Sequence, residues 1–198
     1  MPNRLMGFLL LLVFWPLIMV LGLLIWLFSG WPIFYFQDRV GYRGKVFKII
    51  KFRTMRRDAD LIKKKYRHLN EADGPVFKIR NDPRLTQIGK FLFHSGLDEM
   101  PQFINIIKGE MVLVGPRPLP VEEESKIKRE YSKRKLVKPG IMSLWILNGY
   151  HGMKFDNWMK SDLEYVNNKN WFNDLVIMIR GGVLMWRLFW RELRQLFW

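Results

Sequence analysis

The longest apolar run of the chain lies near its N-terminus. No charged residue occurs between Arg4 and Asp38, and the 24 residues at positions 5–28 are almost wholly apolar. Because an α-helix rises by about 1.5 Å per residue, a helix of this length can cross a hydrocarbon core of about 30 Å. The run is too long and too aromatic for the core of a signal peptide. We therefore expect a retained membrane anchor over residues 1–31.

Pro16 interrupts this run near its middle. A proline removes a backbone N–H donor and disfavours helical geometry at the preceding residue, Trp15, so a helix should kink or break there. Two arrangements remain open: a kinked helix that spans the bilayer, and a re-entrant hairpin that bends at Trp15–Pro16 and returns to the same side. Basic residues flank both ends of the run, only weakly at Arg4. The spanning arrangement is slightly favoured by these residues alone, because kinked spans are common.

The rest of the chain alternates short apolar elements with polar segments. Aromatic and β-branched runs at residues 33–36 and 46–50 flank a glycine-containing turn, which predicts two strands joined by that turn. Apolar side chains near helical spacing in the polar stretch 58–70 predict a surface helix. We also expect helices at residues 88–92, 101–108, 120–136, 158–165 and from 174 onward, a strand at 111–114, and a short apolar element at 141–147. These elements predict an α+β fold that is mostly helical.

The C-terminal segment is amphipathic. Arg187, Arg191 and Arg194 are spaced so that they share one helix face. Aromatic and aliphatic side chains cover much of the remainder, namely Trp186, Phe189, Trp190, Leu193, Phe197 and Trp198. This pattern favours a helix that lies in a membrane interface over residues 181–198. The alternative is an ordinary amphipathic helix packed on the core.

Charge and composition point to an anionic partner. The chain carries 33 Lys and Arg against 18 Asp and Glu, a net charge of +15. Nucleic acid, acidic lipid head groups and phosphorylated substrates all fit this charge, and the nine Trp residues favour a membrane interface. The absence of cysteine excludes disulfides, thiol nucleophiles and thiolate metal sites. His68, His94 and His151 lie far apart in sequence, so we expect no histidine-built metal site.

Adjacent carboxylates are the clearest candidates for chemistry. Asp98 and Glu99 precede Pro101, and proline favours the first turn of a helix, so both should lie at or beside a helix N-terminus. The plain alternative is that they cap this helix. The functional alternative is that one carboxylate attacks phosphorus while its neighbour holds a divalent cation such as Mg²⁺.

Phosphate groups require cations, and several basic residues lie beside rigid or extended backbone. Arginine matches phosphate oxygens with a planar fork of donors. Arg117 is the most distinctive, because Pro116 and Pro118 fix the backbone on both sides of it. The other candidates are Lys51, Arg53, Arg80 and Arg84. The chain contains neither GxGxxG nor GxxxxGK[ST], so Rossmann and P-loop phosphate sites are not predicted.

Four long motifs occur in the order seen in a known family. They are WPIFYFQDRVGYRGKVFKIIKFRTM, GPVFKIRNDPRLTQIGKFL, GLDEMPQFINIIKGEMVLVGPRP and KPGIMSLW. Over residues 5–180 the chain resembles the bacterial sugar transferases, which are monotopic polyprenyl-phosphate phosphoglycosyl transferases, and its length resembles the small single-domain members. The resemblance implies Mg²⁺-dependent transfer of a sugar phosphate from a UDP-sugar to undecaprenyl phosphate, with release of UMP. It also implies a covalent aspartyl intermediate.

The resemblance assigns roles to individual residues. Asp98 matches the nucleophile of the family, and Glu99 matches its acidic partner, which would bind Mg²⁺ or activate the lipid phosphate. Lys51 matches a basic residue of the opening motif, and Arg117 matches the arginine that would bind phosphate. Asp174 matches an acidic residue near the end of the family pattern. With Arg53 and Arg84, these residues form the expected phosphate- and nucleotide-binding set.

The resemblance also bears on location and domain organisation. The family places a re-entrant helix, broken at a proline, in the membrane, and Pro16 matches that break, which reverses the preference for a spanning helix. We expect a re-entrant membrane helix over residues 1–31, a cytoplasmic catalytic domain over 32–180 and an interfacial amphipathic helix over 181–198. The expected site of action is the cytoplasmic face of the bacterial inner membrane. Expected partners are anionic membrane lipids, a second copy of the chain and downstream glycosyltransferases.

Some positions depart from the family pattern. Phe93 and Tyr150 stand where many members have Arg, and Met142–Ser143 replaces the common Thr–Gly. These departures bear on sugar and nucleotide contacts, for which Lys90 or Lys154 could compensate, and not on the nucleophile. A non-catalytic membrane scaffold is the alternative function. Nucleic-acid binding also fits the charge but gives no reason for the apolar anchor, so we expect no nucleic-acid partner.

Overall fold

The computed structural model describes residues 2–147 and 153–197. Most of the described residues that lie in regular elements are helical, and two small sheets of two strands each accompany the helices. This agrees with the predicted α+β fold. The α-helices and strands are α1 (Pro2–Ser29), β1 (Phe34–Val40), β2 (Val46–Phe52), α2 (Ala59–Ile62), α3 (Gln87–Ser95), α4 (Phe103–Lys108), β3 (Val112–Val114), α5 (Val121–Glu124), β4 (Gly140–Met142), α6 (Leu144–Leu147), α7 (Phe155–Asn167) and α8 (Trp171–Phe197). The 3₁₀ helices are η1 (Tyr42–Gly44), η2 (Lys63–Leu69), η3 (Leu97–Gln102) and η4 (Arg129–Leu136).

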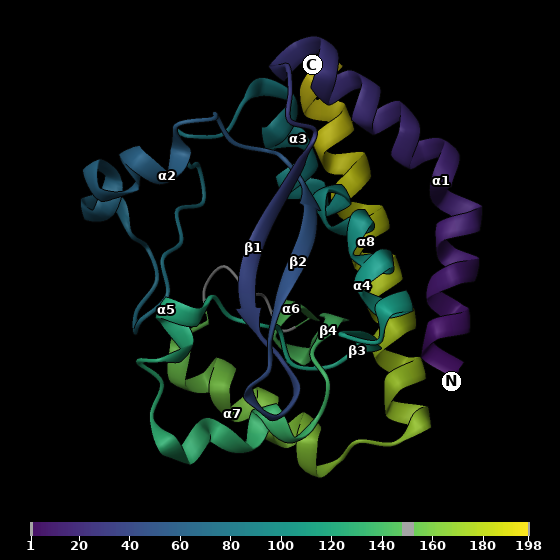
Figure 1. Cartoon of the computed structure of the whole chain (residues 1–198), viewed down its shortest axis with the longest axis vertical. Helices are drawn as coiled ribbons and strands as arrows, with labels where there is room; N and C mark the ends of the chain where they lie inside the picture. The colour runs from purple at the N-terminus through teal and green to yellow at the C-terminus, as the bar shows by residue number, and fades with distance from the viewer. Residues whose placement is uncertain (1, 148–152, 198) are drawn as a thin grey trace.

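The β1–β2 hairpin runs through the middle of the molecule (Figure 1). Its strands pair in antiparallel register, from Phe34 opposite Phe52 to Val40 opposite Val46. Alternation in the first half of β2 buries Phe47 and Ile49 and exposes Val46 and Lys48, whereas Ile50 and Phe52 are buried as well. The prediction of two strands joined by a turn is confirmed, and both strands extend beyond the predicted ranges.

Helix α1 contacts the body of the protein near both of its ends. Near its start, an added Cβ on Gly7 would lie 2.8 Å from Cγ2 of Ile106, which shows how closely α1 approaches α4. Near its end, Leu21 and Ile25 are buried in a core cluster with Phe52. Most apolar side chains between these two contacts are exposed. Residues 3–29 are also long and apolar enough to cross a membrane, and only 17% of the most apolar window is buried, which supports membrane association.

The predicted break at Trp15–Pro16 requires correction in its local form. The helix continues through Pro16 without interruption from Pro2 to Ser29. Figure 1 shows that it bends about halfway along its length instead of breaking. A proline in a helix interior accounts for such a bend, because it removes one hydrogen bond and its ring displaces the preceding turn.

Helices α3 and α4 lie next to the hairpin. Asn105 of α4 is fully buried and bonds to β2 twice, because its Oδ1 accepts from the N–H of Ile50 and its Nδ2 donates to the carbonyl of Lys48. Thr86 caps α3 by accepting from the N–H of Gly89 at 3.0 Å. The intervening η3 therefore packs against β2, which brings residues 97–102 beside Lys51.

Strands β3 and β4 form a short parallel pair beyond this hairpin. Gly115 and Gly140 meet where the strands are joined, and a Cβ on Gly140 would lie 2.1 Å from the backbone nitrogen of Gly115. Two backbone bonds, Gly115 N–H to Met142 O and Gly140 N–H to Pro116 O, fix the segment that follows β3. This segment carries Arg117.

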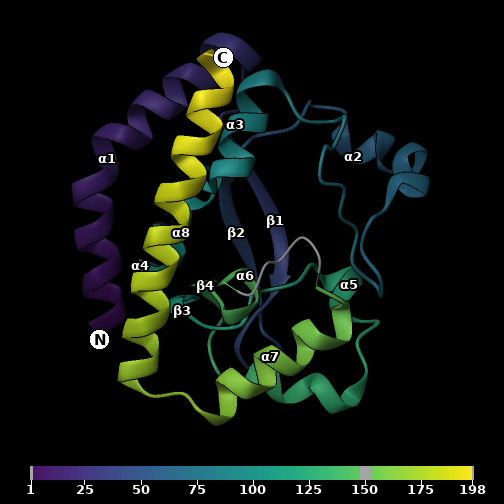
Figure 2. The same cartoon turned by 180° about the vertical axis from the view of Figure 1, so that it is seen from behind.

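The C-terminal helix α8 is longer than predicted. It begins at Trp171, so the expected boundary between residues 180 and 181 falls inside one continuous helix. Figure 2 shows it crossing the back of the molecule, where Phe189 packs edge-on against Phe91 of α3 with ring centroids 5.9 Å apart. The predicted helix at 120–136 is also corrected, because the chain there forms α5 and η4 with a break between them.

Candidate active site

Asp98 and Glu99 lie in the first turn of η3, directly after the end of α3. Gly96 separates the two helices with a φ of 76°, a left-handed conformation that glycine adopts without strain. Gly96 also occupies the N-cap position of η3, where no side chain caps the helix. The alternative that Asp98 and Glu99 merely cap a helix is therefore wrong, because neither side chain forms a capping hydrogen bond. Their carboxylates instead face two cations from other parts of the chain.

Lys51 of β2 is the first of these cations. Its Nζ lies 2.6 Å from Oε1 of Glu99 and 3.6 Å from Oδ2 of Asp98. All three side chains are largely buried, so their interaction is weakly screened by solvent. One ammonium group therefore contacts both members of the acidic pair.

Arg117 is the second cation and holds Glu99 from another direction. Its Nη2 and Nη1 donate to Oε1 and Oε2 of Glu99 at 2.6 and 3.3 Å, so both carboxylate oxygens accept hydrogen bonds. The backbone around Arg117 is fixed by two other arginines. Arg134 donates to the carbonyl of Arg117 at 2.5 Å, and Arg39 donates to the carbonyl of Pro118 at 2.8 Å.

Burial and charge separate the two carboxylates electrostatically. Burial raises the pKa of Asp98 to about 6, although the nearby ammonium of Lys51 acts to lower it. The Glu99 carboxylate is buried too, but the charges of Arg117 and Lys51 outweigh that burial and hold its pKa well below its ordinary value. Glu99 is thus a permanently ionised, doubly paired group, whereas Asp98 has a weaker hold on its charge.

Arg39, Lys78 and the indole of Trp145 also lie close to Arg117. The sequence analysis did not identify them as site residues. Burial lowers the pKa of Arg39 to about 10, and the positive charge of Arg117 adds to that effect. Lys78 lies with its Nζ 5.1 Å from the ring centroid of Trp145, and the guanidinium carbon of Arg117 lies 5.8 Å from that centroid. We call Arg39, Lys51, Lys78 and Arg117 the cationic cluster.

Comparison with known proteins identifies the family. The family model described as bacterial sugar transferase matches residues 2–187. The chain belongs to the bacterial sugar transferase family. This confirms the resemblance carried by the four motifs and supports an enzyme of the phosphoglycosyl transferase class.

Named relatives extend this comparison. The chain is 42% identical over 152 residues to the galactosyl transferase CpsE of Streptococcus agalactiae. This match covers 76% of this chain and 34% of CpsE. It is 37% identical over 175 residues to the exopolysaccharide production protein ExoY of Rhizobium meliloti, covering 86% of this chain and 77% of ExoY. It is 35% identical over 181 residues to the UDP-glucose:undecaprenyl-phosphate glucose-1-phosphate transferase of Escherichia coli, covering 86% and 36%. The chain thus spans about a third of the length of CpsE and of the E. coli enzyme.

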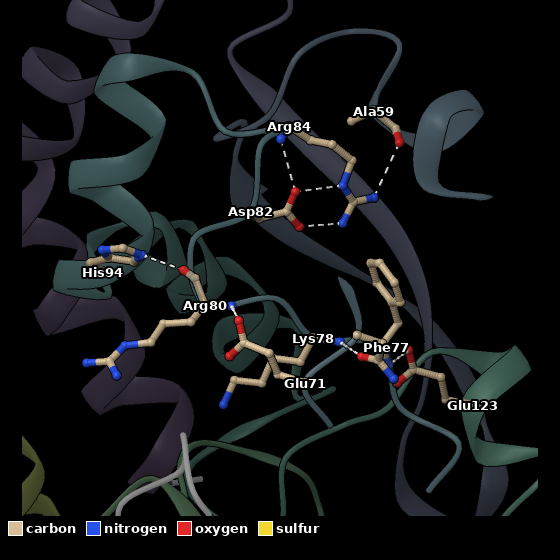
Figure 3. A network of polar contacts seen from close by, with 10 residues as sticks. Ala59, Glu71, Phe77, Lys78, Arg80, Asp82, Arg84, His94 and Glu123 are labelled. Carbon is tan, nitrogen blue, oxygen red and sulfur yellow. Dashed lines mark hydrogen bonds and ion pairs between the residues drawn. The ribbon is translucent and has the colours of Figure 1, made fainter. Parts of the chain in front are cut away.

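Three predicted binding residues of this sugar transferase make their contacts away from the acidic pair, namely Arg53, Arg84 and Asp174. Arg53 donates to the carbonyls of Ser29 and Gly30, so it holds the C-terminal end of α1. Arg84 forms a two-pronged ion pair with Asp82, donates to the carbonyl of Ala59 and is buried (Figure 3). In this structure Nη2 of Arg53 and the donors of Arg84 engage protein groups, whereas the buried Nε of Arg53 has no hydrogen-bond partner among the described residues.

Asp174 also has a protein partner. It lies in the first turn of α8 and accepts a hydrogen bond from the hydroxyl of Tyr165 at 2.8 Å, and the same hydroxyl donates to the carbonyl of Val114 at 2.8 Å. Asp174 is therefore linked through Tyr165 to β3, the strand that precedes Arg117. Among the described residues, Asp174 forms no hydrogen bond or ion pair with Asp98 or Glu99.

The positions that depart from the family pattern are only partly described. Phe93 lies on α3, half-buried, with its ring centroid 5.6 Å from that of His94. Lys90 and Lys154 are exposed. Tyr150 lies outside the described residues.

The carboxylates present could hold a divalent cation only in part. Among residues 2–147 and 153–197, no group of three or more acidic, histidine or cysteine side chains gathers as a metal site would require. Mg²⁺ is commonly bound by one or two carboxylates together with substrate phosphates, and Asp98 and Glu99 fit that smaller donor set. Lys51 and Arg117 already engage both oxygens of Glu99, which leaves Asp98 as the more available ligand.

Proposed function

We propose that this chain transfers a sugar phosphate from a UDP-sugar to undecaprenyl phosphate, giving a polyprenyl-diphosphate sugar and UMP. One observation carries the proposal: a buried aspartate stands beside a glutamate that two cations hold ionised. Family membership supports the reaction class. The printed name of the E. coli relative states a UDP-sugar donor and an undecaprenyl-phosphate acceptor. The reaction would be a membrane step of polysaccharide synthesis, and the name of ExoY indicates exopolysaccharide production for that protein.

In the first step, Asp98 acts as the nucleophile. A carboxylate oxygen forms a bond to the β-phosphorus of the donor, and the bond from that phosphorus to the bridging oxygen breaks. UMP leaves with the bridging oxygen and its electron pair, and the sugar phosphate remains on Asp98. Cations around the transferring group favour this displacement because negative charge accumulates on its oxygens. Lys51 and Arg117 supply two such charges within contact of the acidic pair.

In the second step, the acceptor phosphate takes the place of the enzyme. A phosphate oxygen of undecaprenyl phosphate forms a bond to the same phosphorus, and the bond to Asp98 breaks and restores the carboxylate. Dividing the displacement in two means that the two large anionic substrates need not react with each other directly. The same cations serve both steps, since both transfer one phosphoryl group at one aspartate.

Glu99 and Mg²⁺ would assist these steps. The fixed negative charge of Glu99 keeps Lys51 and Arg117 in position, and this is a positioning role that its hydrogen bonds support. Mg²⁺, when bound by Asp98 and Glu99 with substrate phosphates, would offset the charge of the diphosphate. It would also favour the ionised form of Asp98, whose pKa burial raises.

The lipid acceptor explains the placement of α1. We infer that α1 enters the cytoplasmic leaflet of the bacterial inner membrane and returns to the same side, with its bend at Pro16. The contacts of Gly7 with α4 and of Ile25 with the core support this, because both ends of the helix meet one body. Exposed apolar side chains between those ends would face lipid tails.

The exposed face of α8 would rest on the same membrane. Apolar side chains spaced by three or four residues remain exposed along most of this helix, namely Phe172, Leu175, Ile179, Val183, Trp186 and Trp190. Exposed arginines flank this stripe at positions 180, 187, 191 and 194. Such a helix suits an interface with anionic lipids, where the arginines meet phosphate head groups. The proposed membrane face therefore begins at Phe172, nine residues before the predicted start at 181.

UMP release tests the proposed reaction. Purified protein in detergent, supplied with a panel of UDP-sugars, should release UMP in multiple turnovers only when polyprenyl phosphate and Mg²⁺ are both present, and a chelator should stop it. Asp98→Asn should reduce the rate by at least about a thousandfold, as expected for loss of a nucleophile. Folded protein that releases no UMP from any donor would contradict the proposal and favour a non-catalytic membrane scaffold.

A further inference from the structure

The ammonium of Lys78 lies over the indole of Trp145, which is itself stacked on a second tryptophan. Trp145 and Trp158 stack with ring centroids 4.1 Å apart and an interplanar angle of 16°, and both are buried in one core cluster. The ammonium of Lys78 lies 5.1 Å from the Trp145 centroid. The backbone of Lys78 is also fixed, because its N–H donates to Oδ1 of Asn70 at 2.7 Å and its carbonyl accepts from the N–H of Glu71 at 2.9 Å.

The same indole carries Arg117, which connects Lys78 to the acidic pair. Arg117 contacts Trp145 with its guanidinium carbon at 5.8 Å and Glu99 with Nη2 at 2.6 Å. Lys78 and Arg117 therefore share the indole of Trp145, and Arg117 links that indole to the acidic pair. Figure 3 shows Lys78 on the stretch of chain that precedes the Asp82–Arg84 pair, whose own contacts are made elsewhere.

Placing two cations on one buried indole is electrostatically unfavourable. Burial and the charge of Arg117 lower the pKa of Lys78 to about 8, while Glu71 acts in the opposite direction. Arg39 experiences the same repulsion from Arg117, and its buried Nε has no hydrogen-bond partner in the described structure. An anion bound among these groups would relieve the repulsion and satisfy this donor.

We propose that Lys78, supported by Trp145, binds the α-phosphate of the nucleotide and stabilises UMP as the leaving group. This rests on the proposed function, because it assumes that the β-phosphorus faces Asp98. The α-phosphate must then lie one phosphate farther from Asp98 than the reacting atom. Negative charge grows on the bridging oxygen as the bond to the β-phosphorus breaks, and a cation beside it lowers the barrier. Lys78 is the member of the cationic cluster that is joined to the acidic pair through Trp145 and Arg117.

Nucleotide binding tests this assignment without requiring turnover. Asp98→Asn protein in detergent with Mg²⁺ should bind UDP, measured by isothermal titration, and adding Lys78→Met should weaken that binding at least tenfold. Lys78→Arg should retain most of it. Lys63→Met is the matched control, because the Lys63 ammonium also lies over an aromatic ring, 5.4 Å from the Phe77 centroid. We expect it to change UDP binding less than twofold.

Steady-state kinetics provide the second readout. In otherwise wild-type protein, Lys78→Met should lower kcat/KM for the UDP-sugar and leave kcat/KM for polyprenyl phosphate unchanged, because in a two-step displacement each value reports one half-reaction and Lys78 acts in the first. Equal UDP affinity in the Lys78→Met and parent proteins would overturn the assignment, as would an unchanged kcat/KM for the donor in an active enzyme. If Lys78→Met unfolds, Lys78→Gln replaces it under the same criteria. Lys78-dependent UDP binding in a protein without turnover would contradict the proposed reaction alone.

Discussion

The ammonium of Lys51 lies 2.6 Å from Oε1 of Glu99, in a setting where both side chains are largely buried. The pair joins the central hairpin to the helix that carries Asp98, so it links the fold to the site. It also places a positive charge 3.6 Å from Oδ2 of Asp98. The protonation of Asp98 therefore depends on Lys51.

The rate of the first half-reaction should depend on pH through Asp98. A nucleophilic carboxylate must be ionised, and burial raises the pKa of Asp98 to about 6. The rate should therefore fall about tenfold per pH unit on an acid limb that bound Mg²⁺ moves below pH 6, because the metal favours the ionised carboxylate. Lys51→Met should move this limb to higher pH by about one unit or more, because an opposite charge has been removed. Lys48→Met, on the same strand but exposed and paired with Asp38, should not move the limb.

Replacing Asp98 should stabilise the folded protein at alkaline pH. The pKa of Asp98 is about 6 when folded and 3.8 in its ordinary state, so the fold favours the protonated carboxyl. That contribution is complete below about pH 3.8 and is lost as pH rises through about 6. At pH 8 Asp98→Asn should unfold at a higher temperature than the wild-type protein. Its free energy of unfolding should be larger by at most about 3 kcal/mol. Thermal melts at pH 8 and pH 5 measure this; an Asp98→Asn protein that is less stable at pH 8 would contradict it.

Arg134 should be essential for stability and for the position of Arg117. It is buried between Glu124 and Asp162 and donates to the carbonyl of Arg117. Arg134→Met leaves the buried Asp162 without its cation and leaves Glu124 with only Lys135 at 3.4 Å, which should cost about 3–5 kcal/mol. Chemical denaturation measures the loss. Lys160→Met breaks only the exposed pair with Asp156 and should cost about 0.5 kcal/mol or less. Equal losses in the two variants would contradict this account.

The topology of α1 can be measured by labelling, because the chain has no cysteine of its own. Asn3→Cys and Lys169→Cys, both at exposed positions, should react with an impermeant maleimide only from the cytoplasmic side. Leu12→Cys, exposed on the middle of α1, should be protected in intact membranes. Labelling of Asn3→Cys from the periplasmic side would show that the helix spans the bilayer.

Local pattern predicted the elements better than it predicted the site. Alternation and the turn at Gly41–Gly44 were enough for the β1–β2 hairpin, since register follows from local geometry. Asp98, Glu99, Lys51 and Arg117 were all named from the sequence, and the fold brings them together. The helix predicted from residue 174 onward agrees with α8 to within three residues at its start, whereas the exposed apolar stripe begins at Phe172, before the interfacial segment predicted at 181–198.

The remaining site residues depend on contacts that sequence spacing does not reveal. Arg53 and Arg84 are arginines beside rigid or extended backbone, as Arg117 is. Arg53 nevertheless binds the end of α1, and Arg84 binds Asp82. Lys78 lies within a quoted motif, yet its role depends on Trp145, which lies in α6 far along the chain. Pairs of distant residues of this kind become visible only after folding.

The central claim is that Asp98 carries the sugar phosphate, and intact-protein mass spectrometry tests it most directly. Protein incubated with Mg²⁺ and an accepted UDP-sugar, without polyprenyl phosphate, should gain the mass of one phospho-sugar. Peptide mapping should place the adduct on Asp98, and adding polyprenyl phosphate should remove it. Asp98→Asn, shown to be folded by its thermal melt, should gain no mass. An adduct on Asp98→Asn, or on any other residue of the wild-type protein, would contradict the account.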